Sequence, residues 1–134
     1  MKRLSICWII GCLLGLVACR PEVPAQAGQG ETDVFPDYRE VTVPVNMAPP
    51  NFKLVNQQLQ GITRLKTMNR ELIIAADHGV FNLSETDWKV LSQDAQGKQI
   101  DVTVYFREPQ SDWKQMSFPI YVSRDSVDAY LVYR

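Results

Sequence analysis

The only histidine of the chain, His78, is the side chain best suited to move a proton near neutral pH. Ser84 and Asp87 follow it closely, so a nucleophile, a base and an orienting acid occur near one another in the sequence. If they met in space, these three groups would make the protein a hydrolase. His78 is also flanked by Asp77 and Gly79, which is typical of a tight, solvent-exposed turn. We favour the turn over catalysis.

The other polar residues show no spacing typical of a metal or cofactor site. Asp77, His78 and Asp101 would offer metal ligands, but their separation matches no ligand pattern. Residues 28–30, Gly-Gln-Gly, are not a phosphate loop, because the sequence predicts neither a strand before them nor a helix after them. We therefore expect a protein that is not an enzyme, with no catalytic residue, no metal and no cofactor.

Cys19 is the residue whose surroundings predict a chemical modification. Lys2 and Arg3 precede an apolar run over residues 4–18, which is shorter than the roughly 20 residues of a membrane-spanning helix and is typical of a secretory signal. The run ends in Leu-Val-Ala-Cys, similar to the bacterial lipoprotein signal, in which the cysteine thiol takes the lipid. We expect residues 1–18 to be removed as a signal peptide and Cys19 to carry acyl chains such as palmitate. An uncleaved anchor, or a secretory signal with an incidental Cys19, is the alternative.

The charge balance and the cysteines agree with an exported, lipid-anchored protein. Lys and Arg number 14 against 15 Asp and Glu, so the chain lacks the basic excess that binding of nucleic acid requires. Cys7 and Cys12 lie in the removed segment, which leaves Cys19 as the only thiol and excludes a disulfide within the mature chain. Arg20 stands where some bacteria place an acidic residue that retains lipoproteins at the inner membrane. We expect attachment to the outer membrane, facing the periplasm, with the cell surface as an alternative.

Residues 19–37 comprise the lipidated Cys19 and a segment rich in Pro, Gln, Gly and Glu without an apolar period. This composition predicts a flexible tether. On random-coil scaling it would place the folded part on the order of 25 Å from the lipid. The folded domain is expected over residues 38–134.

Short alternating stretches follow residue 38. Val41, Val43 and Val45 share one face of a strand that Pro44 confines to a sheet edge. The continuous apolar run at residues 72–76 favours a strand covered on both faces at the centre of the core. A turn at 77–79 would join it to residues 80–83 as a hairpin. Further strands are expected at residues 52–54, 63–67, 100–107, 116–122 and 128–133.

One helix is expected after Ser84, which suits an N-cap and is followed by acidic residues in the first turn. Apolar residues then recur at helical spacing up to Gly97: Trp88, Val90, Leu91 and Ala95. Many short strands with one short helix predict a mainly β fold, an immunoglobulin-like β-sandwich. The cysteine pair of immunoglobulin domains is absent, so this prediction concerns architecture alone, and a partly open barrel is the alternative.

Two segments resemble a known group of proteins. Residues 36–52, Pro-Asp-Tyr-Arg-Glu-Val-Thr-Val-Pro-Val-Asn-Met-Ala-Pro-Pro-Asn-Phe, and residues 126–134, Ser-Val-Asp-Ala-Tyr-Leu-Val-Tyr-Arg, are similar to the amino-terminal region of Bacteroides-type lipoproteins. These are described as TolB-like, as propeller-containing, or as cytochrome c biosynthesis proteins. Trp88 and Trp113 also fall at corresponding positions. The resemblance implies a domain that normally precedes a β-propeller. The cytochrome description finds no support in this chain, which has no Cys-x-x-Cys-His motif.

Aromatic residues on the otherwise polar strand faces are candidates for ligand binding. Tyr105, Trp113, Tyr121 and Tyr130 would form a flat platform on which sugar rings stack. They would equally serve as cross-strand neighbours that stiffen the sheet, or pack against a further domain. We favour this structural role.

Together these features predict a membrane-anchored lipoprotein that acts as a non-catalytic binding or scaffolding module of the cell envelope. Its partners would be membrane lipid through Cys19, and a downstream propeller domain or another envelope protein. The chain stops at residue 134 within a strand pattern, so we expect the truncated amino-terminal domain of a propeller protein. The alternative function is that of a glycan-binding accessory protein at the cell surface.

Overall fold

The clearest period-two pattern in the sequence forms the middle of the larger of two sheets. In the computed structural model, which describes residues 20–128, β8 (Gln99–Arg107) and β9 (Lys114–Val122) form a long antiparallel pair. One face of each strand is buried in the core, as the alternation predicts. The buried residues of this face are Ile100, Val102, Val104, Phe106, Met116, Phe118, Ile120 and Val122.

Four further strands complete the larger sheet: β1 (Gly28–Gln29), β3 (Thr42–Val43), β5 (Gln60–Lys66) and β6 (Glu71–Ala75). β5 pairs with β8 and β6 pairs with β5, both in antiparallel orientation. β1 and β3 both run parallel to β9 on its other side, so the strand order is β1-β9-β8-β5-β6 with β3 also beside β9. β3 is therefore an edge strand and ends before Pro44, which confirms the prediction from the proline.

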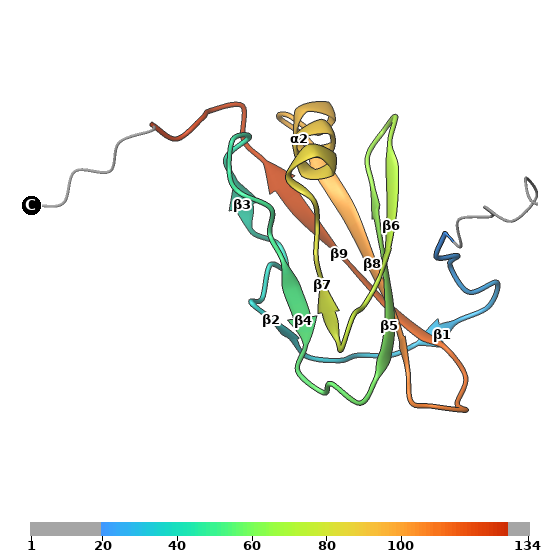
Figure 1. The fold of residues 1–134 in the computed structure, drawn as a ribbon. Helices are drawn as coiled ribbons and strands as arrows, with labels where there is room; N and C mark the ends of the chain where they lie inside the picture. Colours follow the sequence, from blue (N-terminus) through green and yellow to red (C-terminus); the bar gives the residue numbers. More distant parts are fainter. Residues whose placement is uncertain (1–19, 129–134) are drawn as a thin grey trace, which may run out of the picture.

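The smaller sheet consists of β4 (Phe52–Leu54), which pairs on one side with β2 (Val34–Phe35) and on the other with β7 (Val80–Phe81). Figure 1 shows this sheet and the helix packed over the larger sheet. The rings of Phe52 and Phe81 lie 4.8 Å apart, and their side chains belong to the same buried cluster as those of β8 and β9. The fold is thus mainly β, with two packed sheets around one apolar core.

Helix α2 (Glu85–Asp94) begins where the sequence predicts. The Ser84 hydroxyl accepts the amide of Asp87 at 3.1 Å, the usual arrangement of an N-cap. Trp88, Leu91 and Ala95 are buried against the core. Val90 is 37% exposed, so its expected place on the buried face is wrong. The helix has ended before residue 97, as expected.

The interpretation of residues 20–37 as a free tether is wrong for the part that follows residue 27. β1 pairs with β9 and β2 pairs with β4, and the Gly28 amide donates to the Trp113 carbonyl at 2.9 Å. Val34 is only 5% exposed. Strands of two residues are too short to show an apolar period, so backbone pairing attaches this segment and the side-chain pattern does not reveal it.

The apolar run at residues 72–76 does not lie at the centre of the core, contrary to the sequence interpretation. It forms most of β6, which is an outermost strand with half-buried or exposed side chains. The interior place belongs to β5, where Thr63 and Leu65 are almost fully buried. Thr63 is tolerated there because its hydroxyl donates to the Thr103 carbonyl at 3.3 Å. An apolar run predicts burial, but it does not predict the neighbouring strands.

Several expectations concern residues that the structure does not describe. They are the signal peptide at residues 1–18, the lipidation site Cys19, the last strand expected as far as residue 133, and Tyr130 within it. These remain predictions.

Gly61 gives a test of the packing between the two sheets. A Cβ added there would lie 2.8 Å from Phe81 and 2.9 Å from Leu54, both of which are fully buried. We expect Gly61→Ala to lower the free energy of unfolding by about 1–3 kcal/mol through overpacking, measured by urea denaturation. Gly28→Ala is the control, because a Cβ at Gly28 meets nothing within 4 Å. Equal stability of the two variants would contradict this packing.

Candidate functional site

His78 lies in a tight turn at the surface. Its φ is 48° and that of Gly79 is 78°, while Asp77 and Val80 exchange two backbone hydrogen bonds of 2.9 Å. Positive φ at both central residues is the geometry of a two-residue turn, and the value at Gly79 confirms the prediction for that position. The predicted hairpin of residues 72–76 with 80–83 is wrong, because β6 pairs with β5 whereas β7 pairs with β4. The turn instead carries the chain from the larger sheet to the smaller one.

The possible triad of His78, Ser84 and Asp87 is not assembled. The Ser84 hydroxyl donates to the Asp87 carboxylate at 2.7 Å and accepts the Asp87 amide, so both residues serve the start of α2. The imidazole is 96% exposed, and its described polar contact is with Asp77, at 3.6 Å. A nucleophile needs a base within hydrogen-bond reach. The arrangement therefore stabilises a helix terminus and a turn.

The possible metal ligands are also dispersed. Asp77 and His78 lie in the turn after β6, whereas the Asp101 carboxylate accepts a hydrogen bond of 2.6 Å from the Gln99 amide on β8. Within residues 20–128, no three acidic, histidine or cysteine side chains are close enough to hold one ion.

The expected aromatic platform is not a continuous surface. Tyr105 lies on β8 opposite Gln115, near the Trp113 end of the set, and is only 4% exposed, so it is unavailable for stacking on a sugar. The Arg64 guanidinium lies 5.9 Å from the centre of the Tyr105 ring, on the neighbouring strand β5. The outward face of the larger sheet is therefore not uniformly exposed. The placement of Tyr105 on an open polar face is therefore wrong. Thr103, on the same face of β8, is buried as well.

The two other described aromatic residues of the set lie at opposite ends of β9. Trp113 is half-buried, and the Arg107 guanidinium lies 4.4 Å from the centre of its ring. Tyr121 is 42% exposed. Eight residues of extended strand separate them by about 26 Å, well beyond the width of one sugar ring. Trp113 borders a hollow of about 580 Å³ with Gln26 and Asp112, and this is a separate site with both polar and apolar walls.

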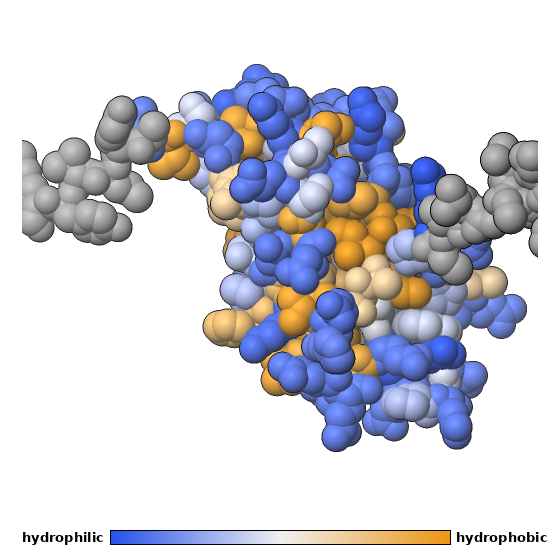
Figure 2. Space-filling model, in the orientation of Figure 1, coloured by the Kyte–Doolittle hydropathy of each residue, from blue (hydrophilic) through white to orange (hydrophobic). Residues whose placement is uncertain are grey.

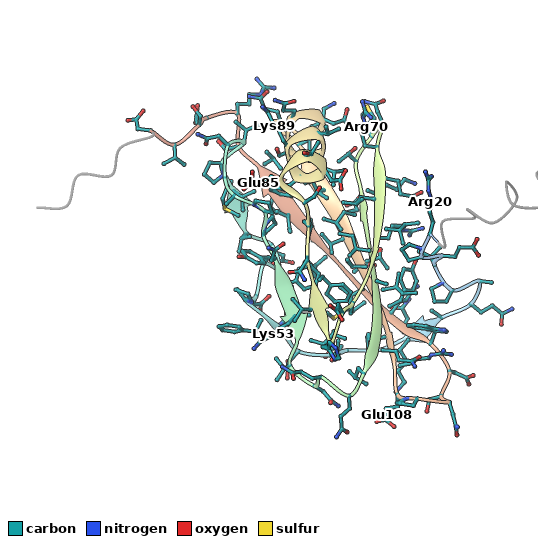
Figure 3. All side chains as sticks on the ribbon, in the orientation of Figure 1. Arg20, Lys53, Arg70, Glu85, Lys89 and Glu108 are labelled. Atoms are coloured by element: carbon teal, nitrogen blue, oxygen red, sulfur yellow. The ribbon has the colours of Figure 1, made fainter. Side chains whose placement is uncertain are left out.

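A mainly apolar groove lies between α2 and the loop that follows β3, and we call it the α2 groove. Its volume is about 440 Å³. Figure 3 shows Glu85 and Lys89 on the helix that forms one wall. The lining residues are Val45, Asn46, Met47, Ala48, Pro49, Glu85, Trp88, Lys89, Ser92 and Gln93. The sequence analysis missed this site because its two walls are about 40 residues apart and neither wall carries a motif.

Trp88 holds the two walls of the α2 groove together. Its indole N–H donates to the Met47 carbonyl at 2.8 Å, and the side chain is only 2% exposed. A buried indole needs such a partner. The same contact satisfies the loop carbonyl, so the loop conformation depends on the helix.

The far end of the described chain is attached beside this groove. The Asn46 side-chain amide donates to the Val127 carbonyl at 2.8 Å, and its oxygen accepts the Val127 amide at 2.8 Å. This pair of bonds imitates the backbone exchange between two strands. Because Asn46 also lines the α2 groove, Val127 lies at its rim.

The end of α2 is fixed to the turn between β5 and β6 by Asp94. Its carboxylate accepts hydrogen bonds from the Asn69 side-chain amide at 2.9 Å, from the Asn69 backbone amide at 3.2 Å and from the Thr67 hydroxyl. The Asn69 amide, followed by the Thr67 hydroxyl, holds the pKa of Asp94 below its ordinary value. A carboxylate at a helix carboxyl terminus is otherwise unfavourable, so these donors explain its presence.

Neither a protein-family model, nor a curated protein, nor a solved structure matches the chain. Within residues 20–128, no helix combines the length and the apolar character needed to traverse a bilayer.

Asp94 predicts a pH-dependent contribution to stability. Because its pKa is lower in the folded state than in the unfolded state, its contribution is complete above the ordinary pKa of 3.8 and is lost as the pH falls through the lower value. We expect Asp94→Asn to lower the thermal midpoint at neutral pH, and the difference from the parent to shrink in acid. Asp125→Asn is the control, since its carboxylate accepts no hydrogen bond within residues 20–128. A difference that is constant with pH would contradict the assignment.

Proposed function

We propose that the protein is a lipoprotein of the cell envelope and that its β-rich body is a non-catalytic binding or scaffolding module. The observation that carries the proposal is the order of features in the leader: Lys2 and Arg3, an apolar run, and then Leu-Val-Ala before Cys19. Export, removal of residues 1–18 and acylation of Cys19 follow from this order. Arg20, in place of an acidic residue, favours the outer membrane facing the periplasm.

The fold gives this proposal a definite geometry. Strand β1 starts at Gly28, which is nine residues after Cys19. Fully extended, that segment spans at most about 30 Å. A lipid on Cys19 would therefore keep the body close to the membrane surface. A free tether up to residue 37 would allow a larger maximum distance. Two acyl chains or more would be needed to hold it firmly.

The non-catalytic assignment is supported by the separation of the reactive groups. His78 is exposed in a turn, while Ser84 and Asp87 serve the N-cap of α2. The α2 groove, in contrast, has the apolar walls of a binding surface and lies where the chain continues beyond Val127. We assign it to contact with the region that follows, which agrees with the resemblance of residues 36–52 to TolB-like, propeller-containing lipoproteins. The two packed sheets are in keeping with an immunoglobulin-like sandwich in that role.

The alternative of a glycan-binding accessory protein is less well supported. Burial of Tyr105 removes one of the expected stacking residues, and the Arg107 guanidinium lies over the ring of Trp113. Stacking on a sugar needs an open aromatic face.

Acylation of Cys19 is tested by metabolic labelling with radioactive palmitate. We expect the parent chain to incorporate the label and Cys19→Ser to lose it completely, because the thiol is the attachment point. Cys12→Ser is the matched control and should label like the parent, since that residue lies in the removed leader. Labelling of Cys19→Ser at the parent level would overturn the anchor.

A further inference from the structure

Strand β6 combines the sequence of an interior strand with an edge position. Residues 72–76 read Leu-Ile-Ile-Ala-Ala, a run typical of strands that are covered on both faces in the interior of a sheet. Within residues 20–128, however, β6 pairs with β5 alone. Its three aliphatic side chains remain half-buried, whereas the corresponding ones of β8 are fully buried. The apolar side chains of β6 are therefore less buried in the folded chain than their sequence favours.

The open side of β6 presents a regular set of backbone groups. The Ala76 amide donates to the carbonyl of Gly61, the second residue of β5, at 2.9 Å, which fixes the phase of the ladder. Residues of an antiparallel strand alternate between bonding to one neighbour and bonding to the other. The N–H and C=O groups of Glu71, Ile73 and Ala75 therefore point away from β5. Such a row of unpaired groups is a template for pairing with a strand of another chain.

The other edge strands of the described region are protected from such pairing. β1, β2, β3 and β7 each contain two residues, and Pro36 and Pro44 closely follow β2 and β3. Short edges and prolines are the usual means by which proteins prevent pairing between molecules. β6 has five residues and contains no proline, glycine or lysine. It is the one edge in residues 20–128 that lacks these devices.

The surface beside β6 is apolar. Leu72, Ile74 and Ala76 pack on the core but remain partly exposed. Figure 2 shows hydrophobic surface over β6 and below α2. A hollow of about 200 Å³ lies between the two elements, where Leu72, Val90 and Leu91 are bordered by Arg70, Glu71 and Asp87. A strand added to β6 would cover this surface as well as the backbone groups.

We propose that β6 is the docking edge for β6 of a second copy of this chain, in antiparallel orientation, with Ile73 opposite Ile73 of the second copy. In this register Glu71 lies opposite Ala75, and Leu72 lies opposite Ile74. All three outward residues then form hydrogen-bonded pairs, two bonds to each pair. The contact is self-complementary, as a two-fold symmetric dimer requires.

Charge and backbone geometry select this register over its neighbours. If Ile74 instead lay opposite Ile74 of the second copy, Glu71 would lie opposite Asp77, which brings two carboxylates together. The backbone of Asp77 is moreover already bonded across the turn to Val80. If Leu72 lay opposite Leu72 of the second copy, the last residues of β6 would face the turn that precedes β6 in the other chain. Both shifts form fewer hydrogen bonds than the register centred on Ile73.

The later part of the same chain does not suit this edge. The described chain leaves the body at the side opposite β6, where Asn46 holds Val127 (Figure 1). The dimer edge and the α2 groove are thus separate surfaces, and pairing through β6 does not depend on acylation of Cys19.

Cysteine cross-linking in cells that produce the full chain tests the register. In a hydrogen-bonded antiparallel pair the facing Cα atoms lie about 5.5 Å apart, within the range that a disulfide spans. We expect Ile73→Cys to give a disulfide-linked dimer on mild oxidation, several-fold above the parent. Ala75→Cys is the matched control, because the two copies of residue 75 would lie about 13 Å apart along the strands. Ala75 is the more exposed of the two, so random collision would favour the control.

A mixture provides the second measurement. Chains with Glu71→Cys and chains with Ala75→Cys should cross-link to each other several-fold more than either does to itself. Dimer formation by Ile73→Cys no greater than by Ala75→Cys, together with no mixed product, would overturn the proposal. So would a cross-linked product of Ile73→Cys whose mass shows a different protein as the partner.

Discussion

The apolar face shared by β8 and β9 is the constraint on which the rest of the structure depends. Eight side chains of this face are buried, and a single sheet cannot remove them from water by itself. The smaller sheet covers part of the face and α2 covers another part, with Trp88 and Phe81 as the largest fully buried side chains of these covers. The cover does not reach β6 completely, which is why its aliphatic residues remain half-buried.

The same long strand organises the two ends of the described chain. β9 accepts β1 and β3 on the side opposite β8, so the segment expected to be a tether becomes part of the sheet. At the other end, Asn46 holds Val127 beside the α2 groove. The α2 groove and β6 lie on different sides of α2.

Several local features could be predicted from the sequence, because the interactions that determine them are local. The alternation at residues 100–107 and 116–122 gave strands with the expected buried faces. Ser84 began the helix, and Gly79 adopted a positive φ in its turn. The leader, ending at Cys19, is likewise a local pattern and is the basis of the proposed function. The candidate groove had no such pattern, since its walls are distant in the sequence and meet through tertiary contacts such as that of Trp88 with Met47.

The sequence by itself determined which stretches are strand, turn or helix and which side chains prefer to be buried. Tertiary structure alone decided which strands became neighbours. Residues 72–76 form a continuous apolar run and yet lie at an edge, whereas Thr63 lies inside, where its hydroxyl donates to the Thr103 carbonyl. Tyr105 is buried on a face that alternation marks as polar. The physical reason is that periodicity records a preference for burial, while the partner that provides it comes from distant parts of the chain through backbone pairing.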